Sequence, residues 1–209
     1  MKIIRFGQKG VSIIADSNIT KKALAEALKE VMEEKPFSKI SISDICERCD
    51  MNRKSFYYHF ADKYDLVNWI FDTEYIAVVA NDYQEFRIEV LLSACRYFYE
   101  NRRFYRSALQ VRGQNSFLEH FHELLHTAGT ARLEIVMEEQ YIPQLPDFCV
   151  DFLVDGFTCA IVRWITEKDP LPPEEFVEYL AILVKGFSFY TSDTIKKRKE
   201  EGVEIWNRI

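Results

Sequence analysis

The sequence of 209 residues predicts an all-α protein with an N-terminal three-helix helix-turn-helix domain and a larger C-terminal helical domain. Three observations predict this class. Only seven Gly and six Pro are present, so turns are few and helices are long. Apolar residues recur at helical spacing along most of the chain. No alternating strand pattern follows residue 17. Separately, no stretch approaches the ~20 apolar residues of a membrane span, so we expect a cytoplasmic protein.

The first helix is expected to begin at Thr20, which can serve as its N-cap, and to stop at Pro36. Leu24, Leu28 and Val31 repeat along one face of this segment, with Lys and Glu opposite them. Residues 1–17 lack a helical period and are expected to form an N-terminal arm.

Two short helices and one longer helix follow. They are expected over 41–49, 52–60 and 63–80, with Ser41, Asn52 and Asp62 as N-caps. Asp44 stands three residues after Ser41, which is a capping-box pattern, and Asp50-Met51 makes a tight turn.

The remaining helices are expected over 83–100, 103–110, 115–139, 147–167 and 174–198. Pro residues lie between the last three of them, where they end one helix or begin the next. No linker of Gly, Ser or Pro interrupts 63–80, so the domain boundary is expected inside that helix. The division is therefore an arm (1–17), a helix-turn-helix domain (18–66), a larger helical domain (67–200) and a tail (201–209).

A short helix, a tight turn and a second short helix are typical of a DNA-binding helix-turn-helix. Phe56 and Phe60 lie four residues apart, so both can bury against Ile45, Cys49 and Met51. The opposite face of 52–60 is then polar. Arg, Lys and Ser side chains reach phosphates and base edges, Tyr hydroxyls donate to phosphates, and helix N-termini attract phosphates.

The stretch from Ser41 to Leu66 resembles the signature of the TetR family of regulators. The telling residues are Phe56-Tyr57-Tyr58-His59-Phe60, followed by Lys63 and Leu66. The resemblance implies that Tyr57 and Lys63 hold phosphates and that Arg53, Lys54 and Ser55 face bases. Asp50 stands where the family usually has Gly, and Asp tolerates the left-handed backbone better than most residues. Lys54 stands where the family often has a small residue, which changes the base or phosphate that is reached.

The residues expected to bind double-stranded DNA are Ser41, Ser43, Asn52, Arg53, Lys54, Ser55, Tyr57, Tyr58, His59 and Lys63. The alternative is a plain three-helix bundle whose aromatic residues are all core, but Tyr57, Tyr58 and His59 do not fit one buried face. For the N-terminal arm, we favour disorder over a basic arm in the DNA minor groove.

The distribution of charge agrees with an N-terminal DNA-binding domain. The net charge is −6, yet residues 1–66 hold 12 Lys and Arg against 10 Asp and Glu, whereas residues 67–209 hold 15 against 23. An acidic body does not exclude DNA binding when a local basic surface meets the phosphates.

The C-terminal domain is rich in aromatic residues, which line many small-molecule pockets, although we expect each of them singly to pack in the core. Arg96, Gln114, Asn115, Arg163 and Trp164 are the expected effector-binding residues. Gly113 to Phe117 and Arg163-Trp164-Ile165 resemble a branch of the TetR family that includes regulators of dihydroxyacetone kinase genes. The effector itself, a small molecule or a protein, is not identified by this resemblance.

The last two helices are the expected homodimer interface. Helix 147–167 carries Gly156 and Ala160 four residues apart, which permits close approach, and helix 174–195 carries a broad apolar stripe. Two-fold pairing through four helices would bury that stripe. A two-fold dimer implies a palindromic operator with half-sites about one DNA turn apart.

His122-Glu123-Leu124-Leu125-His126 matches the H-E-x-x-H pattern of zinc proteases. A zinc protease also needs a third ligand and a sheet edge that holds the peptide, and no strand-rich half is expected here. Cys46 and Cys49 form a lone C-x-x-C without a second pair, and the five Cys residues are expected to be buried thiols.

We therefore expect a homodimeric, effector-responsive transcription regulator that is not an enzyme and needs no metal or other cofactor. Two alternatives remain open from the residues alone. One is a zinc-dependent hydrolase built on 122–126, and the other is a helical protein-interaction module.

Overall fold

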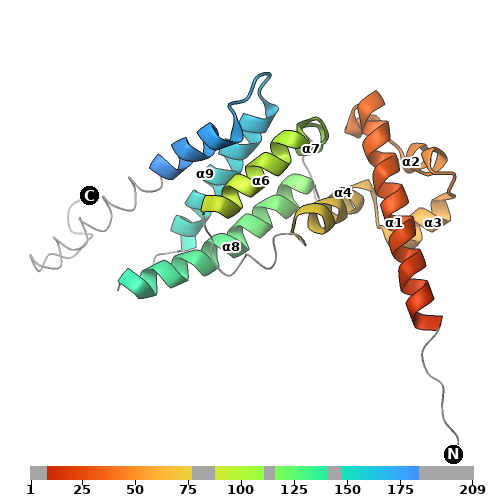
Figure 1. The fold of residues 1–209 in the computed structure, drawn as a ribbon, viewed down its shortest axis with the longest axis horizontal. Coiled ribbons are helices and arrows are strands. Elements are labelled where there is room, and N and C mark those ends of the chain that lie inside the picture. The colour runs from red at the N-terminus through yellow and green to blue at the C-terminus, as the bar shows by residue number, and fades with distance from the viewer. Residues whose placement is uncertain (1–8, 77–87, 111–115, 141–146, 184–209) are drawn as a thin grey trace, which may run out of the picture.

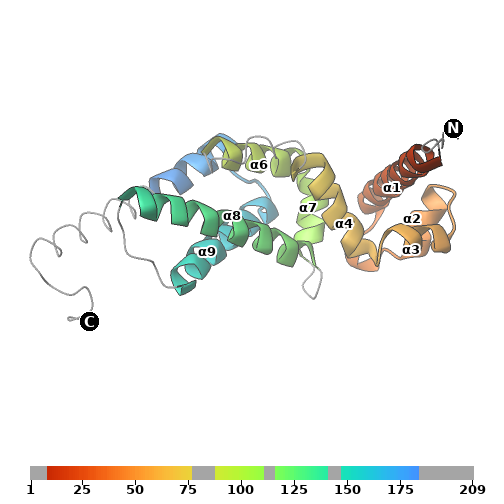
Figure 2. The same ribbon diagram turned by 90° about the horizontal axis from the view of Figure 1, so that it is seen from below.

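The computed structural model describes residues 9–76, 88–110, 116–140 and 147–183, and all of the secondary structure in these ranges is helical, which confirms the all-α prediction (Figure 1). Helices α1 to α3 gather at one end of the molecule, α6 to α9 gather at the other, and α4 lies between the two groups (Figure 2). In the described part of the chain, no helix is long and apolar enough to cross a membrane.

The N-terminal group consists of α1 (Lys9–Glu34), the short 3-10 turn η1 (Phe37–Lys39), α2 (Ile42–Arg48) and α3 (Arg53–His59). Leu24, Leu28, Ile45 and Phe56 are fully buried at its centre, because the apolar positions of the three helices face one another. The expected helices 41–49 and 52–60 are confirmed to within one residue at each end.

The expected start of the first helix at Thr20 is wrong, because α1 begins at Lys9. No Pro interrupts residues 9–34, and the only Gly among them, Gly10, stands at the second position. Once packing fixes the later turns, each added residue gains one hydrogen bond without a new nucleation cost. The helix therefore extends through residues that have no amphipathic period, and only residues 1–8 of the expected arm lie outside the described residues.

Helix α4 (Lys63–Phe71) leads out of the N-terminal group and continues as a single π-helical turn, η2 (Asp72–Ile76). Asp62 caps α4, since its Oδ1 accepts hydrogen bonds from the backbone N–H groups of Tyr64 (2.8 Å) and Asp65 (2.9 Å). The expected helix 63–80 is thus confirmed through Phe71, changes to π geometry at Asp72, and beyond Ile76 lies outside the described residues. A π turn holds one residue more than an α turn, and such turns occur frequently at functional sites.

The C-terminal group contains α6 (Ile88–Glu100), α7 (Arg102–Leu109), α8 (Phe117–Gln140), α9 (Asp147–Thr166) and a helix that begins at residue 173 and is described to residue 183. Its centre is aromatic: the Phe71 ring stacks on that of Phe98 with centroids 5.5 Å apart, and Tyr105, Phe117 and Phe121 surround the pair. Most of these rings are at most 1% exposed, and Phe121 is 4% exposed. These aromatic residues therefore fill a core, as expected of them singly, whereas the same expectation is wrong for Phe148 and Phe152, which are exposed.

One face of the C-terminal group is apolar and exposed. Its residues come from α9 and from the last described helix: Phe148, Phe152, Tyr179, Ile182 and Leu183. Between 54% and 69% of each is accessible to solvent in the single chain. A monomer gains nothing from such a face, which is typical of a surface that a second protein covers.

Candidate nucleic-acid interface

Helix α2 begins with a complete capping box. Ser41 Oγ accepts the backbone N–H of Asp44 (3.2 Å), and Asp44 Oδ2 accepts the backbone N–H of Ser41 (2.7 Å). The Lys35 ammonium and the hydrogen bonds from Ser41 hold the pKa of Asp44 well below its usual range. The first turn of α2 is therefore fixed in place by Ser41, which is occupied as a cap.

The turn between α2 and α3 depends on a left-handed residue. Asp50 has φ 53°, as expected from its position in the turn. The Met51 N–H donates to the Cys46 carbonyl at 2.8 Å and the Asp50 N–H to that of Glu47 at 3.4 Å, which together form a Schellman motif. This motif ends α2 sharply and turns the chain into α3.

Helix α3 is anchored on its inner side, as expected. Asn52 Oδ1 accepts the Ser55 N–H at 2.9 Å and thereby caps the helix. Phe56 is 0% exposed and Phe60 is 3% exposed, and their ring centroids lie 5.8 Å apart in the same buried cluster as Ile45. Trp69 of α4 also contacts the Phe60 ring, so α3 is held from two sides.

The outer side of α3 is polar and aromatic. Arg53 and Lys54 are exposed, Tyr57 is 51% exposed and Tyr58 is 79% exposed. The Arg53 guanidinium lies 6.0 Å from the centroid of the Tyr57 ring, so the two side chains share one patch. Cations and phenols that project together from an anchored helix suit contacts with both base edges and phosphates.

Three of the expected DNA-binding residues on α2 and α3 are only partly accessible. Ser43 is half-buried, and so is His59, where burial and the nearby Lys21 ammonium lower the pKa. Ser55 is also half-buried, and its hydroxyl lies 3.3 Å from Asn52 Oδ1. The exposed part of the expected site is therefore concentrated at Arg53, Lys54, Tyr57 and Tyr58 on α3, with Asn52 and Ser41 beside them as exposed caps.

Lys63 has an intramolecular role that the sequence did not predict. Its Nζ donates to the backbone carbonyls of Phe37 and Ile40, both at 2.8 Å, and lies 4.7 Å from the centroid of the Phe37 ring. Burial lowers the pKa of Lys63, although Asp44 and Asp62 attract its charge. Because the acceptors are backbone atoms, no pattern of side chains in the sequence predicts this contact. Lys63 thus joins the start of α4 to the connection between α1 and α2.

The three expected effector residues that the structure describes, Arg96, Arg163 and Trp164, have different surroundings. Arg96 is exposed and pairs with Glu174 (2.7 Å), whereas Trp164 is 3% exposed, stacks on Phe176 and donates from Nε1 to the Leu171 carbonyl. Arg163 instead lines an open groove between α8 and α9. Trp164 is therefore a core residue and Arg96 a surface ion-pair residue, and Gln114 and Asn115 lie outside the described residues.

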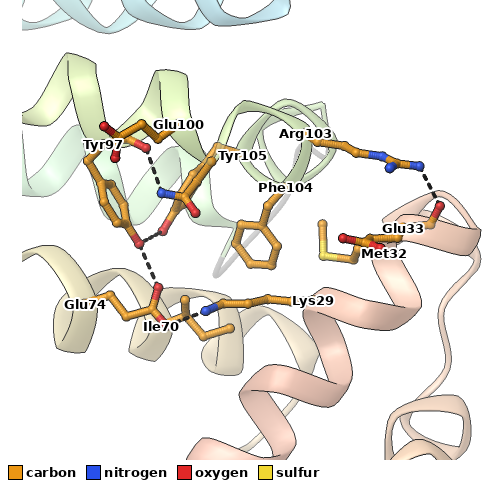
Figure 3. Close-up of a pocket in the computed structure, with 11 residues that line it drawn as sticks. Lys29, Met32, Glu33, Ile70, Glu74, Tyr97, Glu100, Arg103, Phe104 and Tyr105 are labelled. Carbon is orange, nitrogen blue, oxygen red and sulfur yellow. Dashed lines mark hydrogen bonds and ion pairs between the residues drawn. The ribbon is translucent and has the colours of Figure 1, made fainter.

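A different cavity, of about 190 Å³, lies where the two groups of helices meet (Figure 3). Lys29 of α1, Glu74 of η2 and Arg103 of α7 contribute to its lining, together with the rings of Tyr97, Phe104 and Tyr105. Sequence reasoning missed this cavity because its lining comes from five elements, α1, α4, η2, α6 and α7, that no motif links.

The two histidines of the H-E-x-x-H match are engaged with aspartates of α9. His122 Nε2 lies 2.8 Å from Asp155 Oδ1, and His126 Nε2 lies 3.1 Å from Asp151 Oδ1. These pairs join two packed helices, and among the described residues no group of three or more His, Cys, Asp or Glu is placed to hold a metal.

The cysteines follow the expectation in part. Burial raises the pKa of the Cys46 and Cys49 thiols, and Cys49 Sγ lies 3.4 Å from the Ile45 carbonyl, as an ordinary helix residue would. Cys159 is exposed on α9, which corrects the expectation that all of the thiols are buried.

Comparison with known proteins gives one family for both groups of helices. The model described as bacterial regulatory proteins, tetR family, matches residues 24–70, and a model described as a transcriptional regulator C-terminal region matches residues 88–186. A curated relative, the HTH-type dhaKLM operon transcriptional activator DhaS of Lactococcus lactis subsp. lactis (strain IL1403), is 33% identical over 107 residues. That match covers 50% of this chain and 55% of the relative, so it spans about half of each.

Two solved structures share the fold. One is a TetR transcriptional regulator from Streptococcus agalactiae 2603V, with a TM-score of 0.62, 21% identity and coverage of 84% of this chain and 99% of that one. The other is the dihydroxyacetone kinase operon activator DhaS, with a TM-score of 0.58, 22% identity and coverage of 82% and 97%.

Proposed function

Because the chain belongs to the TetR family of bacterial regulatory proteins, we propose that it acts as a homodimer that binds a pseudo-palindromic DNA operator through α3. The family makes the chain a transcription regulator rather than an enzyme. The single observation that carries the proposal is the anchored α3, with Phe56 and Phe60 buried and Arg53, Lys54, Tyr57 and Tyr58 turned outward. A helix of this kind enters the major groove without rearrangement.

Within the major groove, Arg53 and Lys54 stand at the start of α3, the end that meets base edges in helix-turn-helix proteins. The Tyr57 and Tyr58 hydroxyls reach the flanking phosphates. Lys63 donates two of its three ammonium protons to the Phe37 and Ile40 carbonyls, so one proton remains for a phosphate. We assign the sequence-specific contacts to Arg53 and Lys54 and the positioning contacts to the tyrosines and Lys63.

The exposed apolar face on α9 and the last described helix is the proposed dimer interface. Phe148 and Phe152 lie one turn apart on α9, and Tyr179, Ile182 and Leu183 extend the face. A Cβ placed on Gly156 would meet nothing within 4 Å in the single chain, so a partner helix has room to approach there. Two copies related by a two-fold axis would bury both faces at once.

An effector of the C-terminal domain would shift the population of dimers whose α3 helices match the operator spacing. The curated relative is described as the dhaKLM operon transcriptional activator DhaS, and a solved structure with the same fold is described as the dihydroxyacetone kinase operon activator DhaS, so activation is the direction that we propose to test first. We place the regulator in the cytoplasm, where its DNA is.

Fluorescence anisotropy with labelled DNA from the region upstream of its own gene tests the DNA-binding proposal. Wild-type affinity should fall steeply between 50 and 200 mM salt, by about a thousandfold or more if six or more phosphates are contacted. Lys54→Ala and Arg53→Ala should each weaken binding about tenfold or more and alter the preference among operator variants.

Lys168→Ala is the matched control, because it removes an exposed cation from the far group of helices. Binding that is insensitive to salt, or equal in Arg53→Ala, Lys54→Ala and Lys168→Ala, would contradict the assignment of α3.

A further inference from the structure

The cavity between the two groups of helices has the carboxylate of Glu74 in its wall. Glu74 Oε1 accepts a hydrogen bond from Lys29 Nζ of α1, and Glu74 Oε2 accepts one from the Tyr97 hydroxyl at 3.1 Å. The Tyr97 and Tyr105 hydroxyls lie 2.9 Å apart (Figure 3). One carboxylate therefore connects the N-terminal α1 with α6 and α7, and it does so from within the π turn η2.

The electrostatics of the lining favour a cation. Three acidic residues line the cavity, Glu33, Glu74 and Glu100, against the two basic residues Lys29 and Arg103. Arg103 is already engaged, because it donates to the Glu33 carbonyl at 2.8 Å. Burial raises the pKa of the Tyr97 phenol, so this ring stays neutral. Carboxylates beside aromatic walls recognise ammonium groups by charge pairing and cation–π contact.

We propose that this cavity binds a small organic ammonium ion, which pairs with Glu74 against the rings of Tyr97 and Phe104. At about 190 Å³ the cavity is smaller than the usual 300–1,000 Å³ of ligand pockets, so the ion has only a few heavy atoms. The ligand competes with the Lys29 ammonium for Glu74. Lys29 keeps a second partner, Glu26 at 3.2 Å on its own helix, and is therefore not left unpaired when it is displaced.

Displacement of Lys29 loosens one link between α1 and the C-terminal group. Two other hydrogen bonds link α7 to the same end of α1 and to η1. Arg103 donates to the Glu33 carbonyl, and the Phe37 N–H donates to Ser107 Oγ at 3.2 Å. The DNA-binding helices can have one orientation with Lys29 paired to Glu74 and another with Lys29 displaced. The ligand shifts the balance between these two states only as far as its affinity for them differs. This regulatory consequence rests on the proposed function, whereas binding in the cavity does not.

Thermal unfolding of the full chain with n-butylammonium chloride tests the site, with n-butanol and sodium butyrate as neutral and anionic controls at equal ionic strength. Butylammonium should raise Tm saturably, by about 3–6 °C at ten times its Kd. Glu74→Gln should abolish the rise, whereas Glu167→Gln, which removes an exposed carboxylate outside the cavity, should keep it. An equal rise with butanol or butyrate, a rise retained in Glu74→Gln, or no rise at 100 mM butylammonium overturns the proposal.

Lys29→Met is expected to bind the ligand more tightly than wild type, a result that a misfolded variant would not give. With the competing ammonium removed, the Kd for butylammonium measured by calorimetry should fall about fivefold or more. An unchanged or higher Kd overturns the competition between the ligand and Lys29.

Anisotropy with the upstream DNA then separates the cavity proposal from the function proposal. A chain that binds butylammonium but no DNA refutes the proposed function and leaves the cavity site standing. A chain that binds DNA but not butylammonium refutes the site alone. Equal DNA affinity with and without bound butylammonium refutes the regulatory consequence.

Discussion

At the scale of single residues, the backbone of Asp50 and the ammonium of Lys63 hold the DNA-binding helices in place. Asp50 occupies a left-handed position for which a side chain costs free energy, since its Cβ crowds the following carbonyl. Lys63 joins two carbonyls that would otherwise lie half-buried beside a hydrophobic ring. Replacement of Asp50 and replacement of Lys63 should therefore change the free energy of unfolding in opposite directions.

Asp50→Gly should raise the free energy of unfolding by about 0.5–1 kcal/mol, because glycine adopts a positive φ without strain. Urea denaturation measures this change. Asp169→Gly is the matched control. Asp169 lies in an exposed bend without a positive φ, so this replacement should not raise the free energy of unfolding. A destabilised Asp50→Gly, or an equal gain in both variants, would show that the turn is not strained.

Lys63→Met should lower the free energy of unfolding by about 1–3 kcal/mol, because both carbonyls lose a charged donor. Lys39→Met, at an exposed cation of η1 itself, should have almost no effect on stability. Urea denaturation without DNA isolates the intramolecular role from phosphate binding. Equal stability of Lys63→Met and wild type would mean that the hydrogen bonds to Phe37 and Ile40 contribute nothing.

At the scale of elements, caps and turns that act within a few residues set the ends of the helices at the proposed DNA-binding surface. The cap of α2 predicts that Ser41→Ala costs about 1 kcal/mol of stability in urea denaturation, since the Asp44 N–H loses its acceptor. Ser43→Ala, two residues later and outside the cap, is the control and should cost less than half as much. A reversed order would mean that the capping box does not limit the stability of α2.

These local signals explain which elements the sequence predicts well. The caps Ser41, Asn52 and Asp62 and the turn at Asp50 act within a few residues, so they placed α2, α3 and the start of α4 correctly. The early start of α1 and the π turn at 72–76 depend on packing between segments that are distant in sequence. Their residues carry no periodic signal that would reveal them.

The candidate site divides in the same way. The outward face of α3 follows from the spacing of Phe56 and Phe60, and the structure confirms that both are buried. The contacts of Lys63 with backbone carbonyls, and the meeting of Lys29, Glu74 and Tyr97 from three elements, could not be predicted, because no residue type marks a carbonyl acceptor or a long-range junction. The ion pair of Arg96 with Glu174 is likewise a contact between residues distant in sequence, so the sequence did not predict it.

At the scale of the whole molecule, the proposed function depends on two copies of the chain. Phe152→Glu places a charge in the middle of the proposed interface and should convert a dimer into a chain of 24.7 kDa in light scattering. Operator affinity should fall with it, because one α3 then reads only one half-site. Ile19→Glu, at an apolar residue of α1 that is 65% exposed, is the control and should remain dimeric. A dimeric Phe152→Glu would place the interface elsewhere.

The π turn at 72–76 has a genetic consequence. One residue more than an α turn rotates everything downstream by about 100° about the helix axis. Loss of a single codon there would straighten the path of the chain and carry Glu74 away from Lys29. A single in-frame deletion in 72–76 would therefore be enough to uncouple the proposed cavity site from α3.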